Sequence, residues 1–212
     1  MYPFAGSKAP TAVGPVISTL ILTLALAGCG GTGKPQPARI EIQEEVGFVI
    51  TEEARITSVV RADYDQGVRL LEQGQPAEGI EYLAKAVEEA PELSAPRIDL
   101  GIAWHRAGNL EAAEEQLRKA LETNPAHPVV HNELGIVYRK AGRFAEARQS
   151  YEAALGVYPG FHFARRNLAI LCDLYLADLE CAVENYRAYL ETAPDDKEAE
   201  MWLADVQNRI GQ

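Results

Sequence analysis

Apolar residues in the second half of the chain recur at helical spacing, in blocks that proline and glycine separate. The two kinds of helix-ending residue recur as Pro91, Pro125, Pro159 and Pro194, and as Gly74, Gly108 and Gly142. The step is 34 residues in both series, except for 35 residues before Pro194. Because proline cannot continue a helix and glycine can end one in a left-handed turn, each block is predicted to be two antiparallel helices. Glycine is expected at the inner turn of each pair and proline at the outer turn.

Small and large residues alternate within these blocks in a repeating way. The first helices share the pattern Leu100-Gly101-x-x-Trp104 and Leu134-Gly135-x-x-Tyr138, and the second helices share Ala113-x-x-x-Leu117-x-x-Ala120 and Ala147-x-x-x-Tyr151-x-x-Ala154. Small residues allow two helices to approach closely, and larger residues one turn away fill the space beside them. We therefore expect Gly135 and Ala147 to touch across one hairpin.

The pattern resembles the tetratricopeptide repeat (TPR), which has a 34-residue period. The resemblance covers roughly residues 60–194 and implies an all-α fold, a right-handed superhelical solenoid of about four helix hairpins over residues 58–195. Residues 196–212 are expected to form a C-terminal capping helix, because Ala199, Trp202 and Val206 recur at helical spacing. Polar residues replace the tryptophan that the family has early in each unit: Asp63, Arg97, His131 and Arg165. This slot is therefore expected to be exposed.

The fourth block departs from the other three. One extra residue falls near Ala177 and Asp178, and Tyr189 stands where earlier blocks have alanine. The inner turn and the outer packing of this block are therefore the least predictable from the pattern.

The N-terminal segment has a different character. An uncharged run over residues 16–27 ends in Leu26-Ala27-Gly28-Cys29, which resembles the lipobox of bacterial lipoproteins. The resemblance implies a signal peptide over residues 1–28, palmitate or a similar acyl chain on Cys29, and a lipidated N-terminus and tether over residues 29–57. Gly30 rather than Asp after the cysteine implies sorting to the outer membrane, with the protein facing the periplasm. An uncleaved apolar anchor or a short buried helix is the alternative, and the run is short for a membrane-spanning helix.

Composition and charge narrow the classes of partner. The chain has 212 residues, of which 47% are hydrophobic, and a formal charge of -11. This charge repels nucleic acid, so no nucleic acid partner is expected. Residues 40–50 alternate between apolar and polar but match no repeat, which leaves an extended segment on the first helices or a mobile one.

Residue types that support catalysis or metal binding are scarce. His127 and His131 lie four residues apart, as helical metal ligands can, but Pro128 separates them and no Glu or Cys completes a set. We therefore predict no metal site, no cofactor, no small-molecule substrate and no enzymatic activity. Cys172 and Cys181 form either a disulfide or two small buried hydrophobes, and the sequence leaves both open.

The family resemblance places the first helix of each unit on a concave groove. The residues carried over are Ile98, Asp99, Ile102, His105, Arg106, Asn132, Glu133, Ile136, Arg139, Lys140, Arg166, Asn167, Ile170 and Asp173. Four are basic and three acidic, a formal charge of +1. Ile102, Ile136 and Ile170 are 34 residues apart and are predicted to grip apolar side chains of a partner. Arg106, Arg139, Lys140 and Arg166 are predicted to hold its carboxylates, and Asn132 and Asn167 its backbone; the alternative is an ordinary solvated helix face.

These observations favour a scaffold that binds a protein or peptide partner. Lipoproteins of similar design act as pilotins for pilus or secretion channels, which suggests assembly of such an envelope machine. Two alternatives remain: an accessory protein of an energy-transducing transport system, and a passive structural envelope lipoprotein.

Overall fold

The structure is a computed structural model, and it describes residues 39–43, 47–51 and 56–211. The predicted signal peptide, Cys29 and the beginning of the predicted tether lie outside the described residues. No helix among the described residues is both long and apolar enough to cross a membrane.

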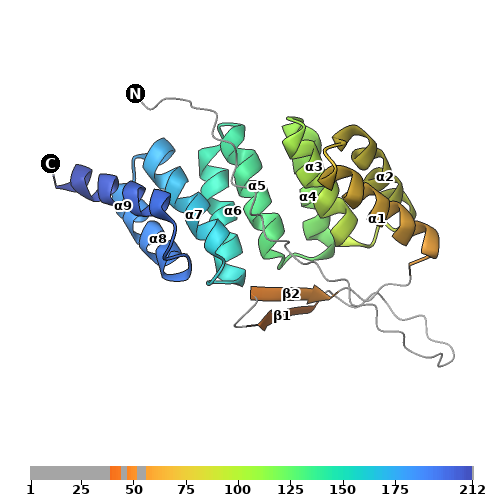
Figure 1. Ribbon diagram of the computed structural model, residues 1–212, viewed down its shortest axis with the longest axis horizontal. Helices are drawn as coiled ribbons and strands as arrows, with labels where there is room; N and C mark the ends of the chain where they lie inside the picture. Colours follow the sequence, from red (N-terminus) through yellow and green to blue (C-terminus); the bar gives the residue numbers. More distant parts are fainter. Residues whose placement is uncertain (1–38, 44–46, 52–55, 212) are drawn as a thin grey trace.

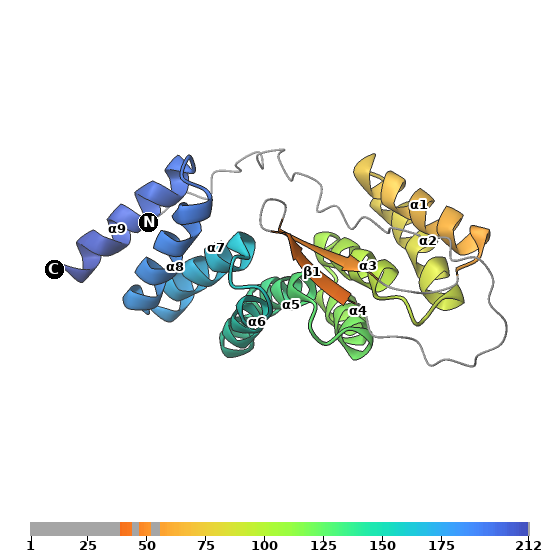
Figure 2. The ribbon, with the colours of Figure 1, turned by 90° about the horizontal axis from the view of Figure 1, so that it is seen from below.

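Helices arranged in consecutive antiparallel pairs make up most of the described chain (Figure 1). They are α1 (Ser58–Glu72), α2 (Pro76–Glu89), α3 (Ser94–Arg106), α4 (Leu110–Thr123), α5 (Pro128–Lys140), α6 (Phe144–Val157), α7 (His162–Leu171), α8 (Leu179–Thr192) and α9 (Lys197–Ile210). Each helix packs mainly on its neighbours in sequence, as a solenoid requires. The predicted array of helix hairpins followed by a terminal helix is confirmed. Figure 2 shows that the array bends, with α5 and α6 at the vertex.

A two-stranded antiparallel sheet precedes the helices. Strand β1 (Arg39–Gln43) pairs with β2 (Gly47–Thr51), and Ile40 lies opposite Ile50. The alternation of apolar and polar residues in this segment is therefore the period of a β-strand. This hairpin adds a small β element to the fold that the repeat pattern did not predict.

Glycines fix both the turns and the close packing of the first three hairpins. Gly74, Gly108 and Gly142 have φ of 76°, 86° and 74° at the inner turns, a conformation that glycine adopts without a steric cost. A second series, Gly67, Gly101 and Gly135, faces the fully buried side chains of Leu83, Leu117 and Tyr151. A Cβ at Gly135 would first meet the Tyr151 ring, so the closest approach is to Tyr151 rather than to the expected Ala147.

The fourth hairpin accommodates its extra residue in a wider turn. Residues Cys172–Leu176 form a π-helical turn after α7, and Ala177 follows in the left-handed region with φ 52°. Asp178 then caps α8 by accepting a hydrogen bond from the Cys181 amide. Cys172 and Cys181 form a disulfide, with their Cα atoms 5.9 Å apart. The bridge joins the widened turn to α8, where the other hairpins use glycine.

We expected the slot of the missing tryptophan to be exposed. In the structure the residues that occupy it are half-buried. Arg97 donates to the carbonyl of Pro91 at 3.1 Å, and the His131 ring lies 2.9 Å from the carbonyl of Pro125. Arg165 instead donates to Asn185. These long polar side chains reach back over the outer turn or across to the next helix.

Candidate functional site

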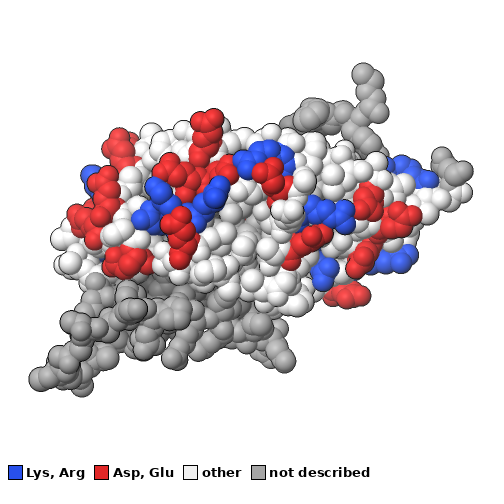
Figure 3. Space-filling model, turned by 180° about the vertical axis from the view of Figure 1, so that it is seen from behind, with Lys and Arg blue, Asp and Glu red and all other residues white. Residues whose placement is uncertain are grey.

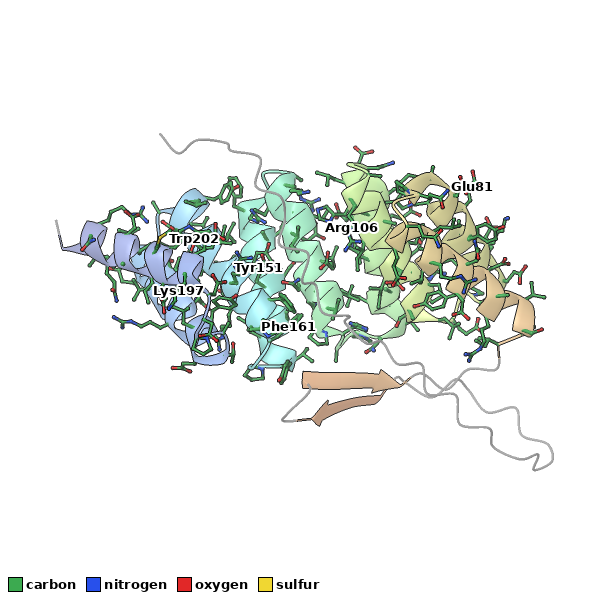
Figure 4. The ribbon with its side chains drawn as sticks, viewed as in Figure 1. Glu81, Arg106, Tyr151, Phe161, Lys197 and Trp202 are labelled. Carbon is green, nitrogen blue, oxygen red and sulfur yellow. A yellow bond between two sulfur atoms is a disulfide. The ribbon has the colours of Figure 1, made fainter. Side chains whose placement is uncertain are left out.

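The described helices enclose an elongated groove of about 730 Å³ on the inner side of the bend. It spans the first helices of successive hairpins and is lined by Tyr64, Asp65, Val68, Arg69, Ile98, Asp99, Ile102, His105, Arg106, His127, Val129, Asn132, Glu133, Ile136, Phe161, Phe163 and Asn167. Figure 4 labels Arg106 and Phe161, which come from α3 and from the residue before α7. A groove of this volume has room for several side chains of a partner.

An apolar row runs along the groove, formed by Val68, Ile102 and Ile136. These residues are 34 apart in sequence, and each occupies the same place on its helix, α1, α3 or α5. Phe161 and Phe163 extend the apolar surface toward α7, and Phe163 is 41% exposed. The row therefore offers a partner one apolar side chain at the equivalent position of each of three first helices, α1, α3 and α5.

An acidic row runs beside it, formed by Asp65, Asp99 and Glu133. Each lies three residues before a member of the apolar row, and residues at this spacing share one helix face. The Tyr64 hydroxyl donates to Asp99 at 2.7 Å. No Lys or Arg that the structure describes comes within ion-pairing distance of these three carboxylates.

Burial dominates the protonation of the two inner carboxyls. It raises the pKa of Asp99 above its ordinary value, although the Tyr64 hydrogen bond and the charge of Arg106 act in the opposite direction. Burial also raises the pKa of Glu133 to about 7, against the charge of Arg106 and the Asn132 hydrogen bond. A carboxylate in this state gains more than an exposed one from a nearby cation.

His105 is the nearest basic group to Glu133 and supplies little positive charge. Its Nδ1 lies 4.0 Å from Glu133 Oε2. Burial, followed by the charges of Lys140 and other cations, lowers the pKa of His105 to about 4. The imidazole is therefore neutral at pH 7, and it does not offset the charge that the acidic row carries once Glu133 ionises above its pKa of about 7.

Nine of the fourteen predicted groove residues line this groove: Ile98, Asp99, Ile102, His105, Arg106, Asn132, Glu133, Ile136 and Asn167. The amides of Asn167 and Asn132 bond to each other at 2.9 Å, and Asn132 also donates to Glu133. The side chains that were to recognise a peptide backbone thus partly satisfy one another.

The other five predicted residues do not line it: Arg139, Lys140, Arg166, Ile170 and Asp173. Asp173 forms an ion pair with Arg209. Arg139 donates to the Tyr151 hydroxyl at 3.4 Å and lies over the Tyr175 ring. Arg166 lies 3.6 Å from Glu198 and stacks over Trp202. Both cations contact other side chains of the same chain, and their role in holding a partner's carboxylates stays a prediction. Ile170 packs against the core, and Lys140 is exposed outside the groove.

Sequence reasoning also missed the contribution of the first hairpin. Val68 precedes Ile102 by the repeat step, so the same period that gave the isoleucines would have found it. Asp65 precedes Asp99 in the same way. Phe161 and Phe163 follow the groove residues His127 and Val129 by the same 34-residue step, so the period would have found them as well.

The histidine pair that sequence spacing raised as a metal candidate is occupied by backbone contacts. His127 Nδ1 accepts from the Val130 amide and caps α5, and burial lowers its pKa to about 3. The one group of possible metal ligands among the described residues contains both disulfide cysteines and Asp178. Thiols joined in a disulfide are not available as thiolate ligands.

Comparison with known proteins supports the repeat assignment. Residues 70–132 and 106–165 match a family model for the tetratricopeptide repeat. No curated protein sequence matches the chain. Many solved structures resemble it, including MamA 41-end from Desulfovibrio magneticus RS-1, with a TM-score of 0.67 and 21% identity, covering 74% of this chain and 88% of that one.

Two further likenesses extend this comparison. A crystal structure of MamA has a TM-score of 0.60 and 24% identity, covering 66% of this chain and 81% of that one. The first TPR of Spaghetti (RPAP3), bound to the HSP90 peptide SRMEEVD, has a TM-score of 0.54 and 20% identity, covering 56% of this chain and 96% of that one. At these identities the likeness shows the fold alone. Together with the family-model match over residues 70–165, it supports the tetratricopeptide-repeat family for this helical array.

Proposed function

We propose that the protein is a lipid-anchored scaffold that binds a segment of a protein partner in its concave groove. The observation that carries this proposal is the groove itself, about 730 Å³ in volume and lined in register by three successive first helices. Its apolar row repeats at the period of the fold, as a surface for an extended ligand requires. The solved TPR domain with a bound peptide is a precedent for a peptide on this fold.

The proposed anchor is an acyl chain on Cys29, supported by the sequence Leu26-Ala27-Gly28-Cys29. Gly30 at the next position supports the outer membrane, with the helices in the periplasm. A disulfide at Cys172–Cys181 is compatible with an oxidising compartment. The role proposed for such a scaffold is assembly of an envelope machine, in the manner of a pilotin for a pilus or secretion channel.

Two measurements test the anchor and the scaffold separately. The Cys29→Ser chain is expected to leave the outer-membrane fraction of a sucrose gradient and to lose the mass of the acyl chains. Unchanged fractionation would overturn the anchor and leave the groove in place.

For the scaffold, a photo-crosslinking amino acid is placed in cells at Ile136, inside the groove, or at the exposed Glu122 of α4. A discrete protein adduct is expected from position 136 and not from position 122. Adducts from position 122 alone would move the binding surface to the outer face.

A further inference from the structure

The part of the groove that the structure describes has a formal charge of -1, three carboxyl groups against two arginines. Its charged lining residues are the acidic row, Asp65, Asp99 and Glu133, together with Arg69 and Arg106. Arg69 donates to Gln66 on its own helix, and neither arginine forms an ion pair with the acidic row. The outer surface is different, because acidic and basic side chains lie close together there (Figure 3). Arg118, Lys119, Arg143 and Arg148 all pair with carboxylates.

The cations expected to attract an acidic ligand are directed elsewhere. Arg139 is held by Tyr151 and Tyr175, and Arg166 by Asp196, Glu198 and Trp202. Of the four basic residues in the sequence-based groove, Arg106 alone lines the groove. An acidic peptide would therefore place its carboxylates beside Asp99 and Glu133, where like charges repel.

The spacing of the two rows sets a period for the ligand. Packed helices lie about 8–10 Å apart. A peptide in the extended polyproline II conformation advances about 3.1 Å per residue and turns the same face to the groove at every third residue, so three residues of a ligand cover about one step between first helices. Each step offers one carboxylate and, one helical turn further along, one apolar side chain.

We propose that the groove selects an extended peptide segment with basic and apolar side chains recurring about every third residue. This inference rests on the proposed function and names the chemistry of its ligand. The ammonium or guanidinium groups of the peptide pair with Asp99 and Glu133, and its apolar side chains contact Ile102 and Ile136. Arg106 also lines this site, and its positive charge would repel a ligand made of basic residues alone. Apolar residues are therefore required between the basic residues of the ligand.

Matched peptides test this selection on the full-length chain. Fluorescence anisotropy compares three labelled peptides of equal length, built from repeats of Arg-Ala-Ile, Gln-Ala-Ile and Glu-Ala-Ile, with SRMEEVD as a further acidic probe. The arginine peptide is expected to bind at least tenfold more tightly than the glutamate peptide, with a preference that declines as salt is added. Equal or tighter binding of the acidic peptides overturns the inference, as does failure of the arginine peptide to bind.

Two pairs of variants locate the effect. Asp99→Asn with Glu133→Gln removes two groove charges, and Glu111→Gln with Glu122→Gln removes two exposed charges from α4. The groove pair is expected to weaken the arginine peptide about tenfold and to leave the glutamine peptide unchanged. The outer pair is expected to change neither, and an equal loss in both pairs overturns the inference, because general attraction then explains the preference.

A third variant separates this inference from the proposed function. Ile102→Asn with Ile136→Asn removes the apolar row without adding charge, and it is expected to abolish binding of the arginine and glutamine peptides, while circular dichroism reports intact helices. If the acidic peptides bind best and this variant abolishes their binding, the selection is wrong and the groove remains the binding site. If every peptide binds this variant as tightly as the unchanged chain, both the selection and the groove are wrong.

Discussion

Replacing Gly135 with alanine tests how tightly the third hairpin is packed. A Cβ at this position would lie 2.4 Å from Cε1 and 2.6 Å from Cδ1 of Tyr151. The Tyr151 side chain has no exposed surface, and its hydroxyl accepts a hydrogen bond from Arg139. The ring therefore cannot swing into solvent, and the helices α5 and α6 must separate to admit the methyl group.

Two opposing effects decide the magnitude. Alanine in place of glycine within a helix stabilises by ~1 kcal/mol. Overpacking in a close-packed core costs about 1–3 kcal/mol. Because the clash is with a fixed ring rather than with the end of a flexible chain, the overpacking cost is expected to win. We expect a net loss of up to about 2 kcal/mol from the free energy of unfolding.

Gly156 supplies the matched control on the facing helix. It lies in α6, is exposed, and a Cβ there would meet no atom within 4 Å. Gly156→Ala is therefore expected to stabilise by about 0.5–1 kcal/mol, through helix propensity alone.

The assay is urea unfolding of each purified variant, followed by circular dichroism at 222 nm. The urea midpoint is expected to fall for Gly135→Ala and to rise for Gly156→Ala. Hydrogen exchange should localise the first loss of protection to α5, α6 and their neighbours, because each repeat contacts mainly adjacent units. Equal upward shifts of both midpoints would refute the close approach of α5 to Tyr151.

Three further predictions concern the other parts of the array. Cys172→Ser with Cys181→Ser should lower the stability of the α7–α8 hairpin by about 2–3 kcal/mol, measured as earlier urea unfolding and faster hydrogen exchange in these helices than in α3 and α4. Arg166→Glu should place a carboxylate beside Asp196 and Glu198, so that α9 is cleaved faster by limited proteolysis, while the equivalent exposed change Arg187→Glu should not. Binding of the arginine peptide should weaken as the pH falls from 8 to 6, because Glu133, with a pKa of about 7, loses its charge, while His105 stays neutral and Arg106 and Lys140 stay charged. Glu133→Gln should remove most of this pH dependence, and an unchanged profile in that variant would contradict the assignment to Glu133.

The repeat pattern predicted the helix array well because its signals are local. Gly108 and Pro125 act on the backbone where they stand, and Gly101 and Leu117 meet within one hairpin of adjacent helices. Such contacts follow from spacing along the chain, which the sequence displays directly. The position of the groove followed from the same period.

The charge of the groove could not be predicted in this way. Helical period placed Arg139 on the inner face, but its hydrogen bond to Tyr151 depends on the side chain that the neighbouring helix presents. Arg166 is directed by α9, which stands outside the repeat period.

The terminal helix α9 explains why Arg166 is directed away from the groove. A terminal helix has one partner instead of two, so α9 needs additional contacts to stay docked. Val206 of α9 is fully buried, and Arg209 of the same helix forms an ion pair with the buried carboxylate of Asp173. Arg166 approaches from α7 to cover Trp202, where cation–π attraction adds to the charge pairs. The basic residue that the repeat period places on the inner face of the last unit thus stabilises the cap, and of the four basic residues predicted for the groove only Arg106 lines it.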